Sequence, residues 1–301
     1  MMPESIEIVE VSARDGLQDE TLVFPTAGKL ELIRRALDAG VKRLEVASFV
    51  HPKLVPQMAD AESLCGQLET RDDVTYIGLV LNQRGLQRAI DTQKLQEIGC
   101  VAVAADGFGL NNQGQGIEES IRVANALIVG AREAGMSGQV TISVAFGCPF
   151  DGEVDQARVV EIATRLAESQ PREIALADTI GVAVPSQVHD TICAVSEALG
   201  PEIPLRAHFH NTRNTGIANV YAACQAGVRI LDSSIGGIGG CPFAPRATGN
   251  IATEDLLYML QRMNYETGLD LERVIHAAGW LGSELNRPVP GMLSRAGTFP
   301  S

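Results

Sequence analysis

The sequence has 301 residues, of which 45% are hydrophobic and 20% are charged, and this composition is typical of a folded globular protein and excludes a disordered one. The net charge of −13 at pH 7 disfavours nucleic acid and anionic membrane surfaces as partners. No apolar stretch reaches the roughly 18 residues that a membrane-spanning helix needs.

Short β-branched apolar runs recur along the chain, and an amphipathic stretch long enough for a helix follows most of them. The predicted strands are 7–13, 43–49, 74–81, 100–105, 140–146, 173–177, 205–210 and 229–235. The predicted helices include 26–39, 117–134, 157–168, 186–199 and 216–226, and two more, 253–263 and 271–285, follow the last strand.

Eight strand–helix units in this length predict an α/β protein with a closed (β/α)8, or TIM, barrel. No segment looks like a linker, so we expect a single catalytic domain over residues 1–301, with additional C-terminal helices from about 253 to 301 packed against the barrel. An open doubly wound sheet is the alternative. It is disfavoured because no G-x-G-x-x-G fingerprint follows the first predicted strand.

In a barrel, the residues that end each strand converge on one face, and that face contains the active site. Arg14 and Asp15 end the first predicted strand, Glu45 lies in the second and Asp178 follows the sixth. These residues would place one cation and several carboxylates at the same barrel end. The other interpretations are a surface ion pair for Arg14 and Asp15, and hydrogen bonding to neighbouring side chains for Glu45 and Asp178.

His208 and His210 lie at the end of the seventh predicted strand. Residues two apart in a strand point to the same side, so both imidazoles can face one ion in the barrel interior. Together with the Asp15 carboxylate and an Asn250 amide oxygen, they would form a nitrogen and oxygen site suited to Mg²⁺, Mn²⁺, Co²⁺ or Fe²⁺. The alternative is a pair of hydrogen-bonded or surface imidazoles.

A glycine-rich loop follows the eighth predicted strand, with the sequence Gly-Gly-Ile-Gly-Gly-Cys-Pro at residues 236–242. Such a loop is flexible, and it leads from the thiol of Cys241 to Gly249 and Asn250. Of the six cysteines, Cys241 is therefore the candidate for a role beyond packing. The alternative is a small residue that only packs in a glycine turn.

These motifs resemble those of the hydroxymethylglutaryl-CoA lyase family, within the wider group of metal-dependent barrel lyases and Claisen-type synthases, over nearly the whole chain. The matching stretches are Arg-Asp-Gly-Leu-Gln at 14–18, Ser-Phe-Val at 48–50, Pro-Lys at 52–53, Val-Pro-Gln-Met at 55–58, Gly-Cys-Pro-Phe at 147–150, Asp-Thr-Ile-Gly at 178–181, Gly-Gly-Cys-Pro at 239–242, Gly-Asn at 249–250 and Ala-Thr-Glu-Asp at 252–255. The Gly-Gly-Cys-Pro loop separates the lyases from the other branches.

The resemblance implies a carbon–carbon lyase that cleaves 3-hydroxy-3-methylglutaryl-CoA to acetyl-CoA and acetoacetate, in leucine degradation or ketone-body formation. It also implies a divalent cation cofactor, Mg²⁺ or Mn²⁺, an acyl-CoA substrate and a homo-oligomer such as a dimer. The residues that it implies as metal ligands are Asp15, His208, His210 and Asn250.

Further roles are carried over from the same resemblance. Arg14 would neutralise the enolate, and Cys241 would transfer a proton from a closing loop. The remaining implied catalytic residues are Glu45, Asp178 and His208, and the implied substrate-binding residues are Arg14, Gln18, Asn286 and Arg287. Asn286 and Arg287 would contact the CoA portion. The chemistry agrees, because this cleavage needs a base, a Lewis acid and a cation facing the enolate.

Three segments depart from the family pattern, at residues 12–13, 105–112 and 211–215. The metal and enolate residues match, so the departures suggest an altered substrate. Arg213 adds a bidentate donor suited to a carboxylate, and we expect it to contact the acid end of a related substrate such as citramalyl-CoA. The alternative for Arg213 is a solvent-facing residue in the first turn of the next helix.

Other functions fit less well. Claisen-type synthases and 4-hydroxy-2-oxo acid aldolases normally have a C-terminal extension beyond the barrel, and a barrel that only binds ligands would lack a metal ligand or the arginine. The six cysteines are widely spaced without a C-x-x-C pair, which argues against a disulfide scaffold. The first residues match no signal or transit peptide, so we expect a cytoplasmic protein.

Overall fold

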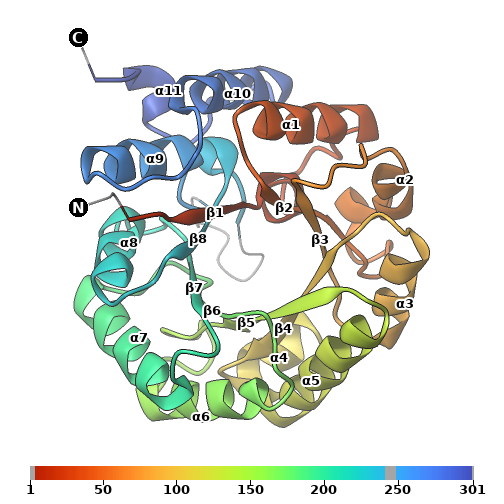
Figure 1. Cartoon of the computed structure of the whole chain (residues 1–301), viewed down its shortest axis with the longest axis vertical. Coiled ribbons are helices and arrows are strands. Elements are labelled where there is room, and N and C mark those ends of the chain that lie inside the picture. The colour runs from red at the N-terminus through yellow and green to blue at the C-terminus, as the bar shows by residue number, and fades with distance from the viewer. Residues whose placement is uncertain (1–3, 241–248, 300–301) are drawn as a thin grey trace.

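The computed structural model describes residues 4–240 and 249–299. Eight parallel strands form a closed barrel in chain order, and helices surround it (Figure 1). Further helices follow the eighth strand, so the predicted TIM barrel with additional C-terminal helices is confirmed. None of the helices in the described residues is long and apolar enough to cross a membrane.

The strands are short, and their side chains are largely buried because the barrel interior is on one side and the helices are on the other. They are β1 (Glu7–Glu10), β2 (Arg43–Ser48), β3 (Thr75–Leu79), β4 (Glu97–Val103), β5 (Ser137–Ser143), β6 (Ile174–Asp178), β7 (Leu205–Phe209) and β8 (Ile230–Ser233). The barrel closes where β1 pairs in parallel with both β2 and β8.

Helices alternate with the strands and bury one apolar side against them. They are α1 (Thr26–Asp38), α2 (Ala61–Gly66), α3 (Gln83–Asp91), α4 (Asp106–Asn112), α5 (Ile117–Glu133), α6 (Gln156–Ala167), α7 (Pro185–Leu199), α8 (Gly216–Gln225), α9 (Thr253–Arg262), α10 (Leu271–Glu284) and α11 (Leu293–Ala296). Three single turns, η1 (Ser12–Gly16), η2 (Pro56–Met58) and η3 (Ile235–Gly237), lie in the connections.

Side-chain caps explain where several helices begin. Asn82 accepts a hydrogen bond from the Gly85 amide at 2.9 Å before α3, and Asp270 accepts one from the Arg273 amide at 3.1 Å before α10. Each cap satisfies a backbone donor that the first helical turn leaves free. The start of α7 instead has a proline, Pro185, whose fixed φ suits the first turn.

The helices after β8 pack against the beginning of the chain. Figure 1 shows α10 beside α1, and Trp280 of α10 makes an edge-to-face contact with Phe24, with ring centroids 6.3 Å apart. The guanidinium of Arg35 on α1 lies 4.7 Å from the centre of the Trp280 ring. Such aromatic and cation–π contacts each add about 0.5–1.5 kcal/mol to the apolar burial.

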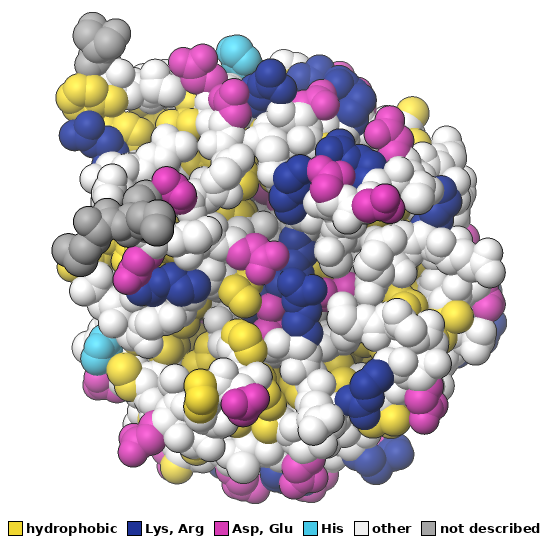
Figure 2. Space-filling view, viewed as in Figure 1, with side chains coloured by type: hydrophobic (Ala, Val, Ile, Leu, Met, Phe, Trp, Pro, Cys, Tyr) yellow, Lys and Arg dark blue, Asp and Glu magenta, His cyan; other side chains and the backbone are white. Residues whose placement is uncertain are grey.

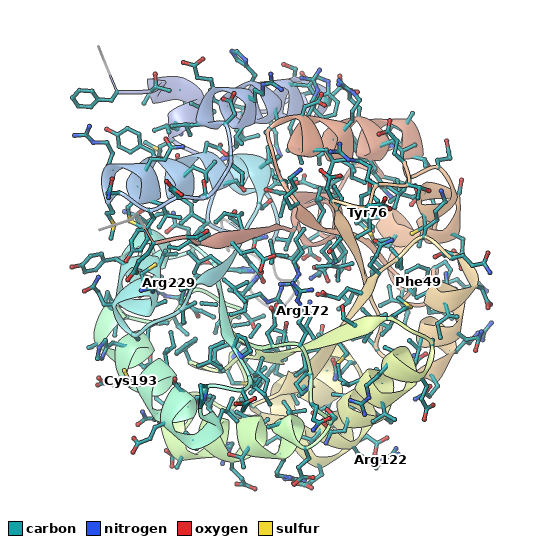
Figure 3. All side chains as sticks on the ribbon, in the orientation of Figure 1. Phe49, Tyr76, Arg122, Arg172, Cys193 and Arg229 are labelled. Atoms are coloured by element: carbon teal, nitrogen blue, oxygen red, sulfur yellow. The ribbon has the colours of Figure 1, made fainter. Side chains whose placement is uncertain are left out.

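One end of the barrel is closed by charged side chains. Arg172, just before β6, lies at the centre of the ring of strands in Figure 3, and lysine and arginine side chains gather at the centre of this face in Figure 2. The Arg172 guanidinium lies 3.5 Å from Glu97 and 3.9 Å from Glu7, and both glutamates are at the starts of their strands. The carboxyl ends of the strands therefore open on the opposite face.

The structure corrects several predicted bounds. The first strand ends at Glu10 and not at residue 13, because the Glu10 carboxylate accepts hydrogen bonds from the amides of Ser12 (2.9 Å) and Ile235 (3.0 Å) and turns the chain into the π-helical turn η1. β4 begins at Glu97 and not at residue 100, since ion pairing buries Glu97 inside the barrel. Residues 106–112, described above only as a variant segment, form α4, and β8 ends at Ser233 before η3.

Candidate active site

Three predicted metal ligands meet at the carboxyl ends of the strands. Asp15 comes from η1, His208 is in β7 and His210 directly follows it, and one ligand atom from each lies within 4.8 Å of the others. The two imidazole rings are 5.1 Å apart between centroids, and His210 Nε2 lies 4.0 Å from Asp15 Oδ2. The H-x-H spacing therefore places both rings on one side of the chain, as predicted.

The charge states of Asp15 and His210 suit a cation, whereas burial lowers the pKa of His208 less than the hydrogen bond and charge of Asp232 raise it. Burial alone would raise the pKa of Asp15, but Arg14 and the two histidines lower it far more, so Asp15 stays ionised. Burial and the neighbouring His208 lower the pKa of His210 to about 4, so its ring is neutral at pH 7. An ionised carboxylate and a neutral imidazole are the forms that bind a metal ion.

Two further observations test whether the residues fit a divalent metal. His210 Nδ1 is buried and has no hydrogen-bond partner among the described residues, which is costly unless something else binds this ring. His210 also forms an isolated bridge with Asn250, which brings the predicted fourth ligand to the same point. Mixed imidazole and carboxylate donors without thiolate suit a divalent metal ion and differ from the thiolate-rich donor set of a structural zinc site. The residues fit.

Asn250 presents its amide nitrogen toward the cluster. Its Nδ2 donates to Asp15 Oδ2 at 2.7 Å and to the Ile238 carbonyl at 3.1 Å. In this orientation Asn250 positions the Asp15 carboxylate, and it would join a metal shell only after its amide rotates to present the oxygen.

Arg14 is clamped between two carboxylates at the edge of this cluster. Its Nε donates to Glu45 Oε2 at 2.8 Å, and its Nη1 donates to Asp15 Oδ1 at 2.6 Å. The guanidinium side chain is 13% exposed, so it is held in place and still faces the barrel mouth. Burial raises the pKa of Glu45, and the Arg14 charge offsets only part of this shift. Arg14 and Glu45 thus lie together, beside the cluster.

Asp178 lies at the end of β6, next to β7. Its two carboxylate oxygens accept hydrogen bonds from the amides of Val182 at 2.8 Å and Ala183 at 3.0 Å, which shape the loop after β6. Burial raises the pKa of Asp178 more than these amides and the charge of His208 lower it. Asp178 therefore holds a loop and also borders the histidine cluster.

The glycine-rich loop after β8 begins and ends beside Asn250. Gly239, with φ of +126°, leaves no room for a side chain, because a Cβ there would lie 2.5 Å from Asn250 Nδ2. Gly249 has φ of +104°, and a Cβ there would meet the Gly239 carbonyl oxygen at 2.6 Å. Both ends of the loop thus need glycine. Cys241 itself lies outside the described residues.

The predicted CoA-binding residues lie at the barrel rim. Asn286 adopts φ of +52° just after α10, and Arg287 forms an ion pair with Glu20, in the connection between η1 and α1. Both residues are exposed. Gln18, in the same connection, is half-buried, and its Oε1 has no hydrogen-bond partner among the described residues. The structure brings Arg287 to the η1 side of the mouth, and it leaves the Gln18 oxygen free for a ligand.

Arg213 is exposed, and it is not free in solvent. Its Nη1 donates to the carbonyl oxygens of Ile180 at 3.0 Å and Gly181 at 2.8 Å, so it fastens the loop after β6 to the loop after β7. The Ile180 loop forms one wall of a cavity of about 520 Å³ at this face. The cavity is lined by Phe146, Gly147, Cys148, Gly152, Glu153, Ile180, Val182, Val184 and Gln187.

The sequence reasoning missed one partner of the site. Asp232 of β8 accepts a hydrogen bond from His208 Nδ1 at 3.0 Å, and Arg206, two residues before His208, donates to Asp232 at 2.9 Å. Both side chains are buried inside the barrel. The available signal was a charged residue within an apolar strand, since burial of an isolated charge is too costly unless it is paired.

Comparisons with known proteins agree with this geometry. A family model described as HMGL-like matches residues 5–280. The chain is 42% identical to an (R)-citramalyl-CoA lyase of Chloroflexus aurantiacus, over 98% of this chain and 95% of that protein. It is 36% identical to a hydroxymethylglutaryl-CoA lyase of Bacillus subtilis, over 96% of each protein.

Solved structures give the same result. The structure of an HMG-CoA lyase from Acinetobacter baumannii in complex with coenzyme A and 3-methylmalate matches with a TM-score of 0.93 and 34% identity, over 99% of this chain and 98% of that one. The structure of the Bacillus subtilis HMG-CoA lyase matches with a TM-score of 0.94 and 35% identity, over 98% of each chain. The chain therefore belongs to the HMGL-like family and is a carbon–carbon lyase.

Proposed function

We propose that the protein cleaves 3-hydroxy-3-methylglutaryl-CoA to acetyl-CoA and acetoacetate with a bound divalent cation, Mg²⁺ or Mn²⁺. The observation that supports this most directly is the Arg14 guanidinium, held by Glu45 and Asp15 beside the Asp15, His208 and His210 cluster. This arrangement puts a fixed positive charge next to a set of metal ligands. A metal-dependent cleavage that passes through an enolate needs both.

Asp15, His208 and His210 would hold the cation, with Asn250 as the fourth ligand if its amide rotates. When bound, the cation supplies Lewis-acid chemistry to the hydroxyl-bearing end of the substrate. Arg287 and Asn286 would bind the CoA portion at the rim. Residues farther inside would orient the acyl group.

The protein's own side chains perform the proton transfers. Asp178, whose pKa is raised by burial, would accept the proton of the tertiary hydroxyl, with His208 beside it. The hydroxyl oxygen then forms a ketone as the bond to the adjacent CH₂ breaks, and the electron pair moves into the thioester enolate. Arg14 faces the enolate oxygen, and Glu45 keeps the guanidinium in place. The enolate carbon finally takes a proton from the Cys241 thiol, and acetyl-CoA results.

Cys241→Ala should leave folding and metal binding intact and lower kcat by at least about 100-fold, because proton delivery by a positioned group contributes about 10² to 10⁴. The measurement is steady-state kinetics together with Mn²⁺ titration of the variant. Cys193→Ala, at an exposed cysteine on α7, is the matched control and should retain full activity. Unchanged turnover of Cys241→Ala would assign this residue to packing alone.

A second substrate is supported by the 42% identity to a citramalyl-CoA lyase and by the variant segment at 211–215. Citramalyl-CoA would yield acetyl-CoA and pyruvate through the same steps. A carbon–carbon bond-forming synthase reaction on the same site is the less favoured possibility. The reaction products distinguish these activities, because cleavage of hydroxymethylglutaryl-CoA yields acetoacetate and cleavage of citramalyl-CoA yields pyruvate.

Arg213→Ala should change the ratio of kcat/KM for the two acyl-CoA substrates by about tenfold, because the guanidinium fastens the loop that lines the 520 Å³ cavity. The measurement is competition kinetics with both thioesters in one mixture. Arg122→Ala, at a highly exposed arginine on α5, provides the control and should leave the ratio unchanged. An unchanged ratio in Arg213→Ala as well would remove Arg213 from substrate selection.

The experiment that tests the proposed function is product analysis by mass spectrometry. Metal-free protein is reloaded with Mg²⁺ or Mn²⁺ and offered hydroxymethylglutaryl-CoA and citramalyl-CoA in parallel. Acetoacetate from the first supports the proposed activity. Pyruvate from the second alone would assign the protein to citramalyl-CoA cleavage. If neither thioester is cleaved while metal is bound, both proposed substrates are wrong.

We also propose that the protein is a dimer, that it lies in the cytoplasm and that it acts in leucine degradation. Light scattering tests the dimer, and cell fractionation tests the compartment.

A further inference from the structure

A continuous chain of ion pairs runs through the barrel interior to one of the histidines. Arg43 Nη1 donates to Glu173 Oε2 at 2.8 Å, and Arg206 Nε lies 3.1 Å from Glu173 Oε1. Arg206 Nη1 then donates to Asp232 Oδ1 at 2.9 Å, and Asp232 Oδ2 lies 3.0 Å from His208 Nδ1. These side chains come from four different strands or strand ends and are all buried.

Each oxygen of Asp232 has one defined donor. Oδ1 accepts a hydrogen bond from the Arg206 guanidinium, and Oδ2 lies against Nδ1 of the His208 ring. An ionised carboxylate only accepts hydrogen bonds, so His208 must carry a proton on Nδ1. The lone pair of a neutral His208 ring then lies on Nε2, the nitrogen that Asp232 does not contact. Arg206 keeps Asp232 from turning, because its guanidinium is itself held by Gln139 of β5, to which Nη2 donates at 2.5 Å.

Packing alone does not account for this arrangement. A buried chain of charges is often less stabilising than apolar side chains of similar volume, because each charge loses its hydration. Arg206, His208 and His210 alternate along the same side of the chain, so the ion-pair chain leads directly into the metal-ligand cluster.

We propose that Asp232, held by Arg206, is a positioning residue that fixes the ring orientation and the tautomer of His208, so that Nε2 is available to a divalent metal ion. The inference rests on the proposed metal site. Asp232 would lie behind the metal ligands, in contact with His208 and with neither the substrate nor the metal.

Asp232→Asn is the variant that tests this inference. The side-chain amide of asparagine has only one oxygen, and we expect this oxygen to accept the hydrogen bond from the permanently charged Arg206. The amide NH₂ then faces His208 Nδ1, which becomes an acceptor, and the proton moves to Nε2. We expect Mn²⁺ to bind this variant about 10- to 100-fold more weakly than the unmodified protein, the range found when such outer partners are removed.

The matched control is Glu97→Gln. Glu97 is also buried and pairs with Arg43, and two residues of the ion-pair chain, Glu173 and Arg206, separate Arg43 from Asp232. The substitution therefore changes a buried, arginine-paired carboxyl group that does not contact His208. Its Mn²⁺ affinity should stay within about threefold of the unmodified protein. Thermal unfolding of both variants separates any general loss of stability from the loss of metal binding.

Two measurements keep the outcomes distinct. Manganese titration followed by electron paramagnetic resonance gives the affinity, and ¹⁵N chemical shifts of His208 in metal-free protein at alkaline pH give the tautomer. Weaker binding and an Nε2-protonated ring in Asp232→Asn support the inference. Unchanged affinity, or an Nε2-protonated ring already in the unmodified protein, would overturn it, and the latter needs no variant to fold.

The same titration tests the metal site itself through His210→Ala. If the unmodified protein binds Mn²⁺ and His210→Ala does not, the proposed metal site is supported. The result for Asp232→Asn then tests only the role of Asp232. If His210→Ala binds as well as the unmodified protein, the proposed site fails. The His208 tautomer would then still show whether Asp232 sets the ring.

Discussion

Arg14→Gln should lower kcat by about 10³-fold while KM changes by less than about tenfold. The guanidinium lies 2.8 Å from Glu45 and 2.6 Å from Asp15, so the two carboxylates fix it before any substrate arrives. A charge fixed in advance acts mainly on the enolate that develops during cleavage, and loss of one such donor costs about 3–4 kcal/mol. Glutamine keeps a polar side chain and removes the charge. Steady-state kinetics at saturating metal give both constants.

Two further variants show whether the effect comes from the charge. Arg14→Lys retains a cation without the planar fork and should recover part of the lost turnover. Arg287→Gln, at the predicted CoA-binding position, should raise KM with kcat nearly unchanged, which is the opposite pattern. A large rise in KM with intact kcat for Arg14→Gln would contradict its role at the enolate. Thermal unfolding of Arg14→Gln measures what the unpaired Glu45 and Asp15 cost the fold.

Asp15→Asn should weaken Mn²⁺ binding at least about 100-fold and abolish metal-dependent turnover. Asp15 is the only carboxylate in the ligand cluster found among the described residues, and its strongly lowered pKa keeps it ionised. The substitution removes that charge and leaves the Asn250 amide nitrogen facing a second amide. Loss of an outer partner alone costs about 10- to 100-fold in metal affinity, and a direct ligand should cost at least as much. Calorimetric titration of metal-free protein measures the change.

Asp19→Asn is the matched control for that variant. Asp19 follows Asp15 by four residues at the same barrel mouth, and burial together with the Asp15 charge raises its pKa to about 7. Its carboxylate is outside the ligand cluster. Mn²⁺ affinity should therefore change by less than about threefold. Equal losses in Asp15→Asn and Asp19→Asn would mean that the total negative charge of the mouth, and no particular ligand, determines metal binding.

The barrel and the histidine pair could be predicted because both depend on local sequence periodicity. Eight apolar runs alternating with helical stretches fix the fold class, and the alternation of side chains in a strand places His208 and His210 together. Asp15 was predicted at the right barrel end, although it lies in the π-helical turn η1 and not in a strand. The bend depends on Glu10 contacting Ile235, 225 residues away, and periodicity contains no information on such a contact.

The buried charges could not be predicted by the same means. Glu97 begins β4 because Arg43 from another strand neutralises it, and a hydrophobic pattern places the strand start three residues later. Asp232 reaches His208 only through the register of β7 against β8. Arg213 is predicted to contact a substrate carboxylate, and periodicity does not reveal that its Nη1 also donates to two backbone carbonyls of a neighbouring loop. Each of these depends on which strands and loops are neighbours, which the fold decides.

The pairing of β1 with β8 and the packing of α1 against α10 make the first part of the chain depend on the last. During synthesis, residues 7–38 leave the ribosome long before residues 230–284 exist. At the usual rate of about 5–20 residues per second, the apolar side of α1 waits many seconds for its partner. The newly made amino-terminal part therefore keeps apolar surface exposed during synthesis, and such surface promotes aggregation. The strand ring can close only when β8 emerges, and α1 is covered only when α10 follows.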